Sequence, residues 1–135
     1  MEAQIYQSDL PNNVEYEKIQ INVTAAGQKV EFSHSTEIDH VRIIGIAQVF
    51  SNENAVPNST LKLVADGQQI FPDGFESKLI YCGQEVPPDD RFTRYINQEA
   101  KQIKVEGTFT DGGSLSQFVP YTANIYLRML TNRSN

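Results

Sequence analysis

The sequence predicts an all-β protein, an antiparallel two-sheet sandwich and, within that class, a jelly roll of about eight strands. Three observations support this fold class. Apolar and polar residues alternate with a period of two along most of the chain, which is typical of strands with one buried face. Turn-forming residues recur at intervals of roughly 8–12 residues, as they do in sandwiches and barrels. No stretch shows a convincing helical period.

Residues 17–24 give the first strand pattern, because Ile19, Ile21 and Val23 alternate with polar residues. Residues 29–33 continue the alternation after a short turn. Two such segments separated by a few turn-forming residues are expected to pair with each other as a hairpin.

The segment 40–50 is apolar on both parities. A strand that is covered on both faces has this pattern, and the many β-branched residues in the segment oppose a helix. Gly45 lies in the middle of the segment. It predicts a bulge or a close backbone neighbour, because glycine in a strand otherwise forfeits packing.

The dipeptide Asp66-Gly67 is the strongest local signal in the chain. It separates the apolar runs 59–65 and 68–71 and favours a type I′ turn, whose twist matches that of the flanking strands. More strands are expected in the second half of the chain, at 75–82, 91–96, 101–109 and 121–130, and residues 115–120 are expected to pair only weakly.

A chain of 135 residues most simply forms one domain. Pro11 and the two asparagines after it break any regular element, so residues 1–15 are predicted to form an extended N-terminal arm. Such arms are either disordered or docked on a neighbouring subunit. The sandwich domain is assigned to residues 16–131 and a polar tail to residues 132–135.

The charge balance narrows the range of partners. The formal net charge is −6, from 17 acidic and 11 basic side chains, and no basic cluster is present. Affinity for nucleic acid comes largely from neutralising phosphates, so no nucleic acid is expected, and the same balance argues against an anionic membrane. No apolar run approaches the roughly 20 residues that span a bilayer, so membrane insertion is not expected. The composition suits a protein that meets protein partners.

The N-terminal segment is polar and acidic, and it lacks the basic start and the apolar run of a signal peptide. We therefore expect the protein to be made in a cytoplasm and not to be secreted by a signal peptide. Cys82 is the single cysteine, which excludes an internal disulfide. It alternates with Ile80, so a buried structural thiol is favoured over a catalytic one.

Both histidines lie in the stretch 34–40, with Glu37 and Asp39 between them. His34, Glu37 and His40 are therefore the candidate ligands of a metal site. Along one strand, however, the two imidazoles would stand roughly 20 Å apart, and the spacing misses the His-x-x-Glu-His pattern. The sequence favours a structural role, in which one strand ends near His34 and the next begins at His40. No metal or other cofactor is expected.

No motif identifies a reaction, so no catalytic residue is assigned and enzymatic activity is not expected. Gly-x-Ser-x-Gly does not occur, and a catalytic pair of carboxylates has a spacing that the fold sets and the sequence does not reveal. Sugar binding favours exposed aromatic rings, and the chain has no tryptophan. The aromatic side chains most expected to show a face are Tyr6, Tyr16, Tyr95 and Tyr126.

The layout of the chain resembles that of single jelly-roll virion proteins of bacteriophages, which are capsid, vertex or decoration subunits. The features that carry the resemblance are the arm over residues 1–16, the short strands over residues 17–130, the segment IFPDGF at 70–75 and the long closing strand 121–130. The resemblance implies a non-enzymatic subunit that packs beside copies of itself, often around a threefold or fivefold axis. The small size of the chain favours a minor or accessory role.

The expected function is thus that of a homo-oligomeric structural protein of a virion, which assembles with copies of itself and with other virion proteins through its sandwich and its arm. The alternative, from another class, is a carbohydrate-binding or receptor-binding sandwich module.

Overall fold

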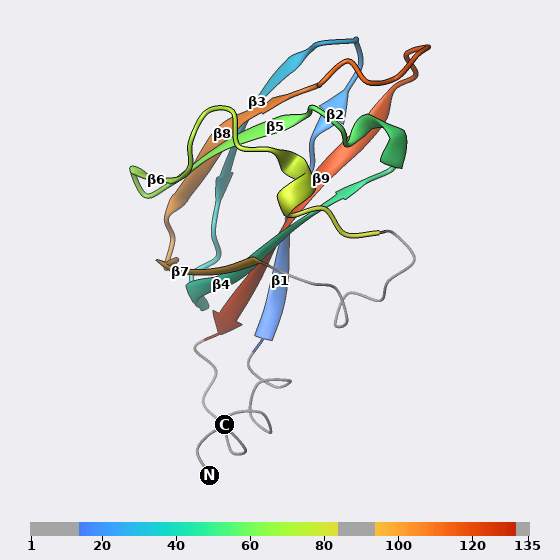
Figure 1. Cartoon of the computed structure of the whole chain (residues 1–135). Helices are drawn as coiled ribbons and strands as arrows, with labels where there is room; N and C mark the ends of the chain where they lie inside the picture. Colours follow the sequence, from blue (N-terminus) through green and yellow to red (C-terminus); the bar gives the residue numbers. More distant parts are fainter. Residues whose placement is uncertain (1–13, 84–93, 132–135) are drawn as a thin grey trace.

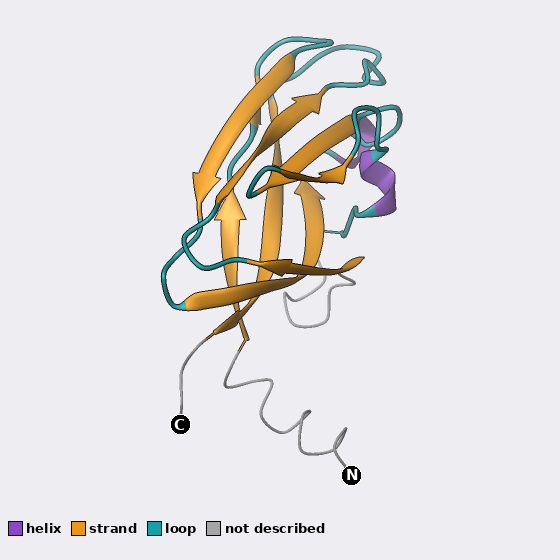
Figure 2. Cartoon of the chain, turned by 90° about the vertical axis from the view of Figure 1, so that its left-hand side faces the viewer, coloured by secondary structure: helices purple, strands orange, loops and turns teal. Residues whose placement is uncertain are grey.

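The computed structural model describes residues 14–83 and 94–131, which form two antiparallel sheets packed face to face (Figures 1 and 2). The all-β prediction is confirmed. The nine strands of this part of the chain are β1 Val14–Ile19, β2 Asn22–Val23, β3 Lys29–Ser35, β4 His40–Phe50, β5 Thr60–Ala65, β6 Gln68–Phe71, β7 Arg94–Glu99, β8 Lys104–Thr110 and β9 Tyr121–Thr131. Its helices are two short 3₁₀ turns, η1 Glu53–Ala55 and η2 Ser77–Leu79.

The strand pairing follows the order of a jelly roll. β1 and β2 both pair with β9, β3 pairs with β8, β4 with β7, and β5 with β6. The chain is therefore paired like one long hairpin whose tip is the β5–β6 turn. This hairpin is wound up so that β9 also pairs with β4, and β8 also pairs with β5. The two sheets have the orders β1-β9-β4-β7, with β2 beside β9, and β3-β8-β5-β6. When β1 and β2 are counted as one interrupted strand, this is an eight-stranded jelly roll.

The predicted hairpin between residues 17–24 and 29–33 is wrong. The turn between these segments carries the chain from one sheet to the other, so β2 pairs with β9 while β3 pairs with β8. Alternation is a local property that reports which side chains face inward. It carries no information on which distant strand supplies the hydrogen bonds.

Two other local predictions are confirmed. Asp66 and Gly67 both have positive φ angles, 52° and 79°, as a type I′ turn requires, and they join β5 to β6. In β4 the register shifts between Ile43 and Gly45 against both neighbouring strands. Gly45 therefore lies at a bulge, as expected for a glycine inside a strand.

The strand predicted at 75–82 is wrong, because the 3₁₀ helix η2 occupies its middle. Ser77 and Ile80 are both fully buried, and a spacing of three residues between inward-facing side chains is that of a helical turn. Only the end of the segment lies along β4. There the N–H of Gln48 donates to the carbonyl of Ile80 at 2.8 Å, and the N–H of Cys82 donates to the carbonyl of Gln48 at 2.9 Å.

Several other predicted segments differ from the structure in their boundaries. The segment 115–120 forms no strand. The strand predicted at 91–96 appears as β7, which continues to Glu99, and residues 91–93 lie outside the described part of the chain. The predicted arm and tail also lie outside it, apart from Val14 and Glu15. These two residues are the first of β1, so the sandwich begins before residue 16.

The core lies between the sheets and is filled by inward-facing side chains from both. The ring of Phe50 at the end of β4 is fully buried in it; this ring packs edge-on against Phe109 of β8 at a centroid distance of 5.7 Å and stacks on Tyr121 of β9 at 6.1 Å. Phe109 belongs to the four-stranded sheet, so this contact joins the two layers. Cys82 is buried, as predicted.

Candidate functional site

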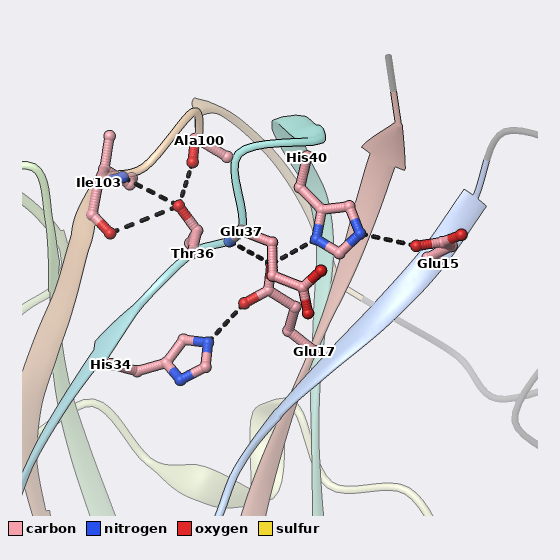
Figure 3. A network of polar contacts seen from close by, with 8 residues as sticks. All are labelled: Glu15, Glu17, His34, Thr36, Glu37, His40, Ala100 and Ile103. Carbon is pink, nitrogen blue, oxygen red and sulfur yellow. Dashed lines mark hydrogen bonds and ion pairs between the residues drawn. The ribbon is translucent and has the colours of Figure 1, made fainter. Parts of the chain in front are cut away.

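The inward-facing side chains of β1 are acidic at the start of the strand and apolar at its end. Ile19 is buried and belongs to the apolar core, whereas Glu17 and Glu15 take the same parity nearer the start of the strand. β1 begins opposite the end of β9, where Val14 pairs with Leu130. The two carboxylates therefore lie at the end of the sandwich where the chain passes from β3 to β4 (Figure 3).

Glu17 is the centre of a polar network at this end. Its side chain is only 3% exposed, and both of its carboxylate oxygens have partners. Oε1 lies 2.5 Å from Nε2 of His34. Oε2 accepts the backbone N–H of Glu37 at 3.0 Å and contacts Nδ1 of His40. A buried carboxylate is costly unless it is paired and hydrogen-bonded, and Glu17 meets this condition with groups from β3, from β4 and from the connection between them.

His40 lies between two carboxylates. Its Nδ1 faces Glu17 and its Nε2 lies 2.9 Å from Oε1 of Glu15. An ionised carboxylate only accepts hydrogen bonds, so when both carboxylates are ionised they favour the ring that carries a proton on each nitrogen, the imidazolium. The side chain of His40 is 2% exposed, and that of Glu15 is 32% exposed. In its protonated form His40 is thus a buried cation between a buried and a partly exposed carboxylate.

The pKa values of His40 and Glu17 are both shifted in the direction that favours the charged form of the side chain. Burial by itself would lower the pKa of His40, but its hydrogen bonds with Glu15 and Glu17 and the negative charges of Glu17 and Glu37 outweigh burial and raise it above 6.5. Burial by itself would raise the pKa of Glu17. The hydrogen bonds from the Glu37 backbone, His40 and His34 outweigh it and lower the pKa below 4.5.

Thr36 fixes the connection that carries Glu37 and leads to His40. Its hydroxyl contacts the carbonyl of Ala100 and accepts the N–H of Ile103 at 2.9 Å, and its own N–H donates to the carbonyl of Ile103 at 3.0 Å (Figure 3). The connection between β3 and β4 is thereby tied to the connection between β7 and β8.

The structure brings His34 and His40 to one carboxylate, although they would be far apart on a single strand. His34 lies on β3 and His40 begins β4, as predicted, and these strands belong to different sheets. Glu37 offers Glu17 its backbone N–H rather than a carboxylate. Within residues 14–83 and 94–131, no group of three or more His, Cys, Asp or Glu side chains is placed to hold a metal ion. The arrangement instead holds a proton on His40 between two carboxylates.

Sequence reasoning missed Glu15 and Glu17, the two anions of the network. A signal was present, because both continue the parity of Ile19, Ile21 and Val23 and therefore point into the sandwich. Acidic residues on the inward parity of a strand require partners. In the structure the two histidines are among these partners.

A second buried carboxylate lies at another corner of the sandwich. Asp111 is 4% exposed, and its Oδ2 accepts the N–H groups of Gly27 at 2.8 Å and Gly113 at 3.2 Å. The hydroxyl of Tyr121 donates to Oδ1. Burial, followed by this hydrogen bond and the charge of Asp111, raises the pKa of Tyr121 far above its ordinary value of 10.0. Asp111 therefore closes two loops, which is the backbone role expected for an aspartate in a turn.

A shallow groove of about 450 Å³ crosses strands β3, β8 and β5 of the four-stranded sheet. Thr108 lies opposite both Glu31 on β3 and Lys62 on β5, and Glu106 lies opposite Ser33 in the neighbouring row. These side chains alternate with the inward-facing residues of their strands and so point away from the core. The groove is lined by Glu31, Phe32, Ser33, Lys62, Val64, Glu106, Gly107 and Thr108.

Gly107, one of the residues that line the groove, is required by the close approach of its neighbours. A Cβ atom at this position would lie 1.9 Å from the carbonyl oxygen of Lys62 and 3.0 Å from Cζ of Phe32. Only glycine allows β5 and the ring of Phe32 to approach β8 this closely.

Comparison of the chain with protein-family models, with curated proteins and with solved structures gives no match. A search of the described residues for a helix long and apolar enough to cross a membrane finds none.

Proposed function

We propose that this chain is a non-enzymatic structural subunit of a virion, a minor capsid or accessory protein that assembles with copies of itself and with other virion proteins. The observation that supports the proposal is the jelly-roll order of the two sheets around a core filled from both sides. Jelly rolls recur as the building domains of viral capsids. The step from fold to function is one of analogy, and the edges and ends of the domain supply the physical means of assembly.

The edges of the sandwich offer main-chain groups to a neighbour. The edge strands are β1 and β7 in one sheet and β3 and β6 in the other. An edge strand presents a row of N–H and C=O groups that can pair with another chain. An extended segment of a second copy can add to such an edge as a further strand.

The chain before Val14 and the chain after Thr131 join the sandwich at the same end, because β1 and β9 run antiparallel and Val14 lies opposite Leu130. This is the end that holds the network of Glu15, Glu17, His34 and His40. In the proposed function the network is structural, since it fastens the strand that follows the predicted arm.

Deleting residues 1–13 is expected to weaken self-association and to leave the sandwich folded. The deletion stops short of Val14 and Glu15, because these residues belong to β1 and Glu15 contacts His40. Light scattering of the full chain and of the truncated chain measures the mass of each assembly, and circular dichroism reports whether the strands remain. We expect a lower mass for the truncated chain and the same β-rich spectrum.

Two results would count against the arm as an assembly element. One is an unchanged mass after the deletion, and the other is loss of the β spectrum, which would place residues 1–13 in the fold itself. A full chain that is monomeric at all accessible concentrations would count against the structural subunit.

The second candidate function is carbohydrate binding, and the groove across β3, β8 and β5 favours it. Carboxylates, hydroxyls and an ammonium group stand in adjacent rows there, with Glu31, Thr108 and Lys62 in one row. Cross-strand neighbours are about 5 Å apart, a spacing at which several of these groups reach the hydroxyls of one sugar. Phe32, the aromatic residue among those that line the groove, is half-buried and packs against the core.

A glycan array separates the two functions. If the groove binds sugar, the wild-type chain gives clear signals that the double variant Glu31→Gln with Lys62→Gln loses. A matched control is Lys78→Gln, because Lys78 is exposed on η2 and does not line the groove. No binding by the wild-type chain, or binding that the double variant retains, contradicts the groove as a sugar site.

A further inference from the structure

We propose that Glu15, Glu17, His34 and His40 form a pH-dependent latch, which fastens the first half of the edge strand β1 at neutral and mildly acidic pH and releases it at higher pH. The proposal rests on geometry at the start of β1 and holds whether or not the chain builds a virion. It assigns to the two histidines a conformational role.

The inward-facing side chains in the first half of β1 are held by ionic contacts. β1 lies at the edge of its sheet and pairs with β9. Its inward side chains are Glu15, Glu17 and Ile19, of which the last belongs to the apolar core. From Ile19 onward, apolar burial secures the chain. Before it, the contacts with His34 and His40 do so.

The latch depends on the second proton of His40. With both ring nitrogens protonated, His40 donates to Glu17 through Nδ1 and to Glu15 through Nε2. A neutral imidazole has one N–H and one lone pair. When His40 loses a proton, a lone pair faces a carboxylate inside the protein, and one of the two contacts must open.

The contact to Glu15 is the one that opens. Glu17 is 3% exposed and retains the donors from His34 and the Glu37 backbone, so it cannot turn to water without leaving those donors behind. The side chain of Glu15 is 32% exposed and lies nearer the start of the strand. The remaining proton therefore stays on Nδ1, and the release is confined to the segment 14–16.

The charged groups that act on His40 come from two elements. Glu15 and Glu17 belong to β1, and Glu37 belongs to the connection between β3 and β4. His34 on β3 faces the same carboxylate, that of Glu17. On the β9 side, the residue opposite His40 is Thr131, which does not titrate. The three carboxylates favour the imidazolium, so they keep the latch closed to a higher pH than an ordinary histidine would allow.

Two measurements on the full-length wild-type chain test the latch between pH 5.5 and pH 9.5. The ring-nitrogen resonances of His40 report its protons, and amide hydrogen exchange, corrected for the intrinsic rate, reports the protection of β1. We expect both nitrogens of His40 to be protonated at pH 7 and Nδ1 alone to keep its proton above the transition. Through the same transition, protection of residues 14–16 falls by about tenfold, while that of residues 17–19 changes by less than about twofold.

The variant Glu15→Gln sharpens the test. An amide at position 15 can accept from the imidazolium through its oxygen and donate to the neutral ring through its nitrogen. The pH dependence of protection at residues 14–16 should therefore disappear in this variant. The matched control Glu31→Gln removes an exposed carboxylate from β3 and should keep the wild-type behaviour.

Three outcomes would overturn the proposal. They are a neutral His40 at pH 6, retention of the last proton on Nε2 instead of Nδ1, and protection of residues 14–16 that is independent of pH in the wild-type chain. A fourth outcome would overturn it as well. If protection of residues 14–16 stays strongly pH-dependent in Glu15→Gln, a group other than Glu15 controls the release.

Discussion

Glu17→Gln is expected to lower the free energy of unfolding by about 3–5 kcal/mol at pH 6, the range observed when one partner of a buried ion pair is removed. The glutamine amide has one oxygen and one NH₂ group, whereas the three partners of Glu17, from His34, His40 and the Glu37 backbone, all donate. The substitution therefore turns an NH₂ group toward a buried donor and removes the anion beside the imidazolium. Urea unfolding followed by circular dichroism measures the loss.

The same variant should change how stability depends on pH. The pKa of His40 is raised above 6.5, so its contribution is fully present below 6.5 and is lost as the pH rises through the raised value. The pKa of Glu17 is lowered below 4.5, so its contribution is fully present above 4.5 and is lost as the pH falls through the lowered value. The difference between wild type and Glu17→Gln should be largest from pH 4.5 to 6.5 and shrink on either side.

The exposed pair of Glu76 and Lys78 provides a control for Glu17→Gln. These side chains lie 3.1 Å apart, with 52% and 61% of their surfaces exposed, and pairs of this kind contribute little to stability. Glu76→Gln should therefore leave the unfolding curve almost unchanged. If Glu17→Gln behaves like Glu76→Gln, Glu17 is not a buried ionic centre.

Phe50→Ala is expected to destabilise the protein by about 3–5 kcal/mol, the range for truncating a fully buried phenylalanine. Phe50 is 0% exposed, and its ring contacts Tyr81, Phe109 and Tyr121 at centroid distances of 5.9, 5.7 and 6.1 Å. The contact with Phe109 spans the two sheets, so the cavity would lie where the layers meet. Thermal and urea unfolding at fixed pH measure the effect.

Two comparisons distinguish this cavity from a general loss of apolar surface. Phe50→Leu keeps part of the volume and should fall between wild type and Phe50→Ala. Leu79→Ala removes an apolar side chain that is 50% exposed and should cost much less. Equal effects of Phe50→Ala and Leu79→Ala would contradict a packed core at Phe50.

The local features of the fold were predictable because they depend on neighbouring residues. The Asp66-Gly67 turn needs two positive φ angles, which these residue types tolerate, and the structure has both. Gly45 indicated a bulge because a glycine inside a strand loses side-chain packing and often marks a bulge or a close backbone approach. The failure at 75–82 has the same origin, since a short apolar segment fits a strand and a helical turn equally well.

The candidate site could be predicted only in part. The sequence marked the two histidines as potential ligands, and the predicted start of a strand at His40 is confirmed. Their partner Glu17 lies 17 and 23 residues away in sequence. Among 17 acidic residues, parity could mark Glu15 and Glu17 as inward-facing, but it could not say what they face.

The sequence by itself determined that the chain forms β-strands, which of their side chains point inward, and where the tightest turn lies. These properties follow from a period of two and from the φ angles that single residues adopt. The tertiary structure alone decided that β3 pairs with β8 and not with its neighbour along the chain, and that His34 and His40 meet at Glu17. Both outcomes depend on contacts between residues that are well separated in sequence, and no short segment of the sequence records which separated residues will meet.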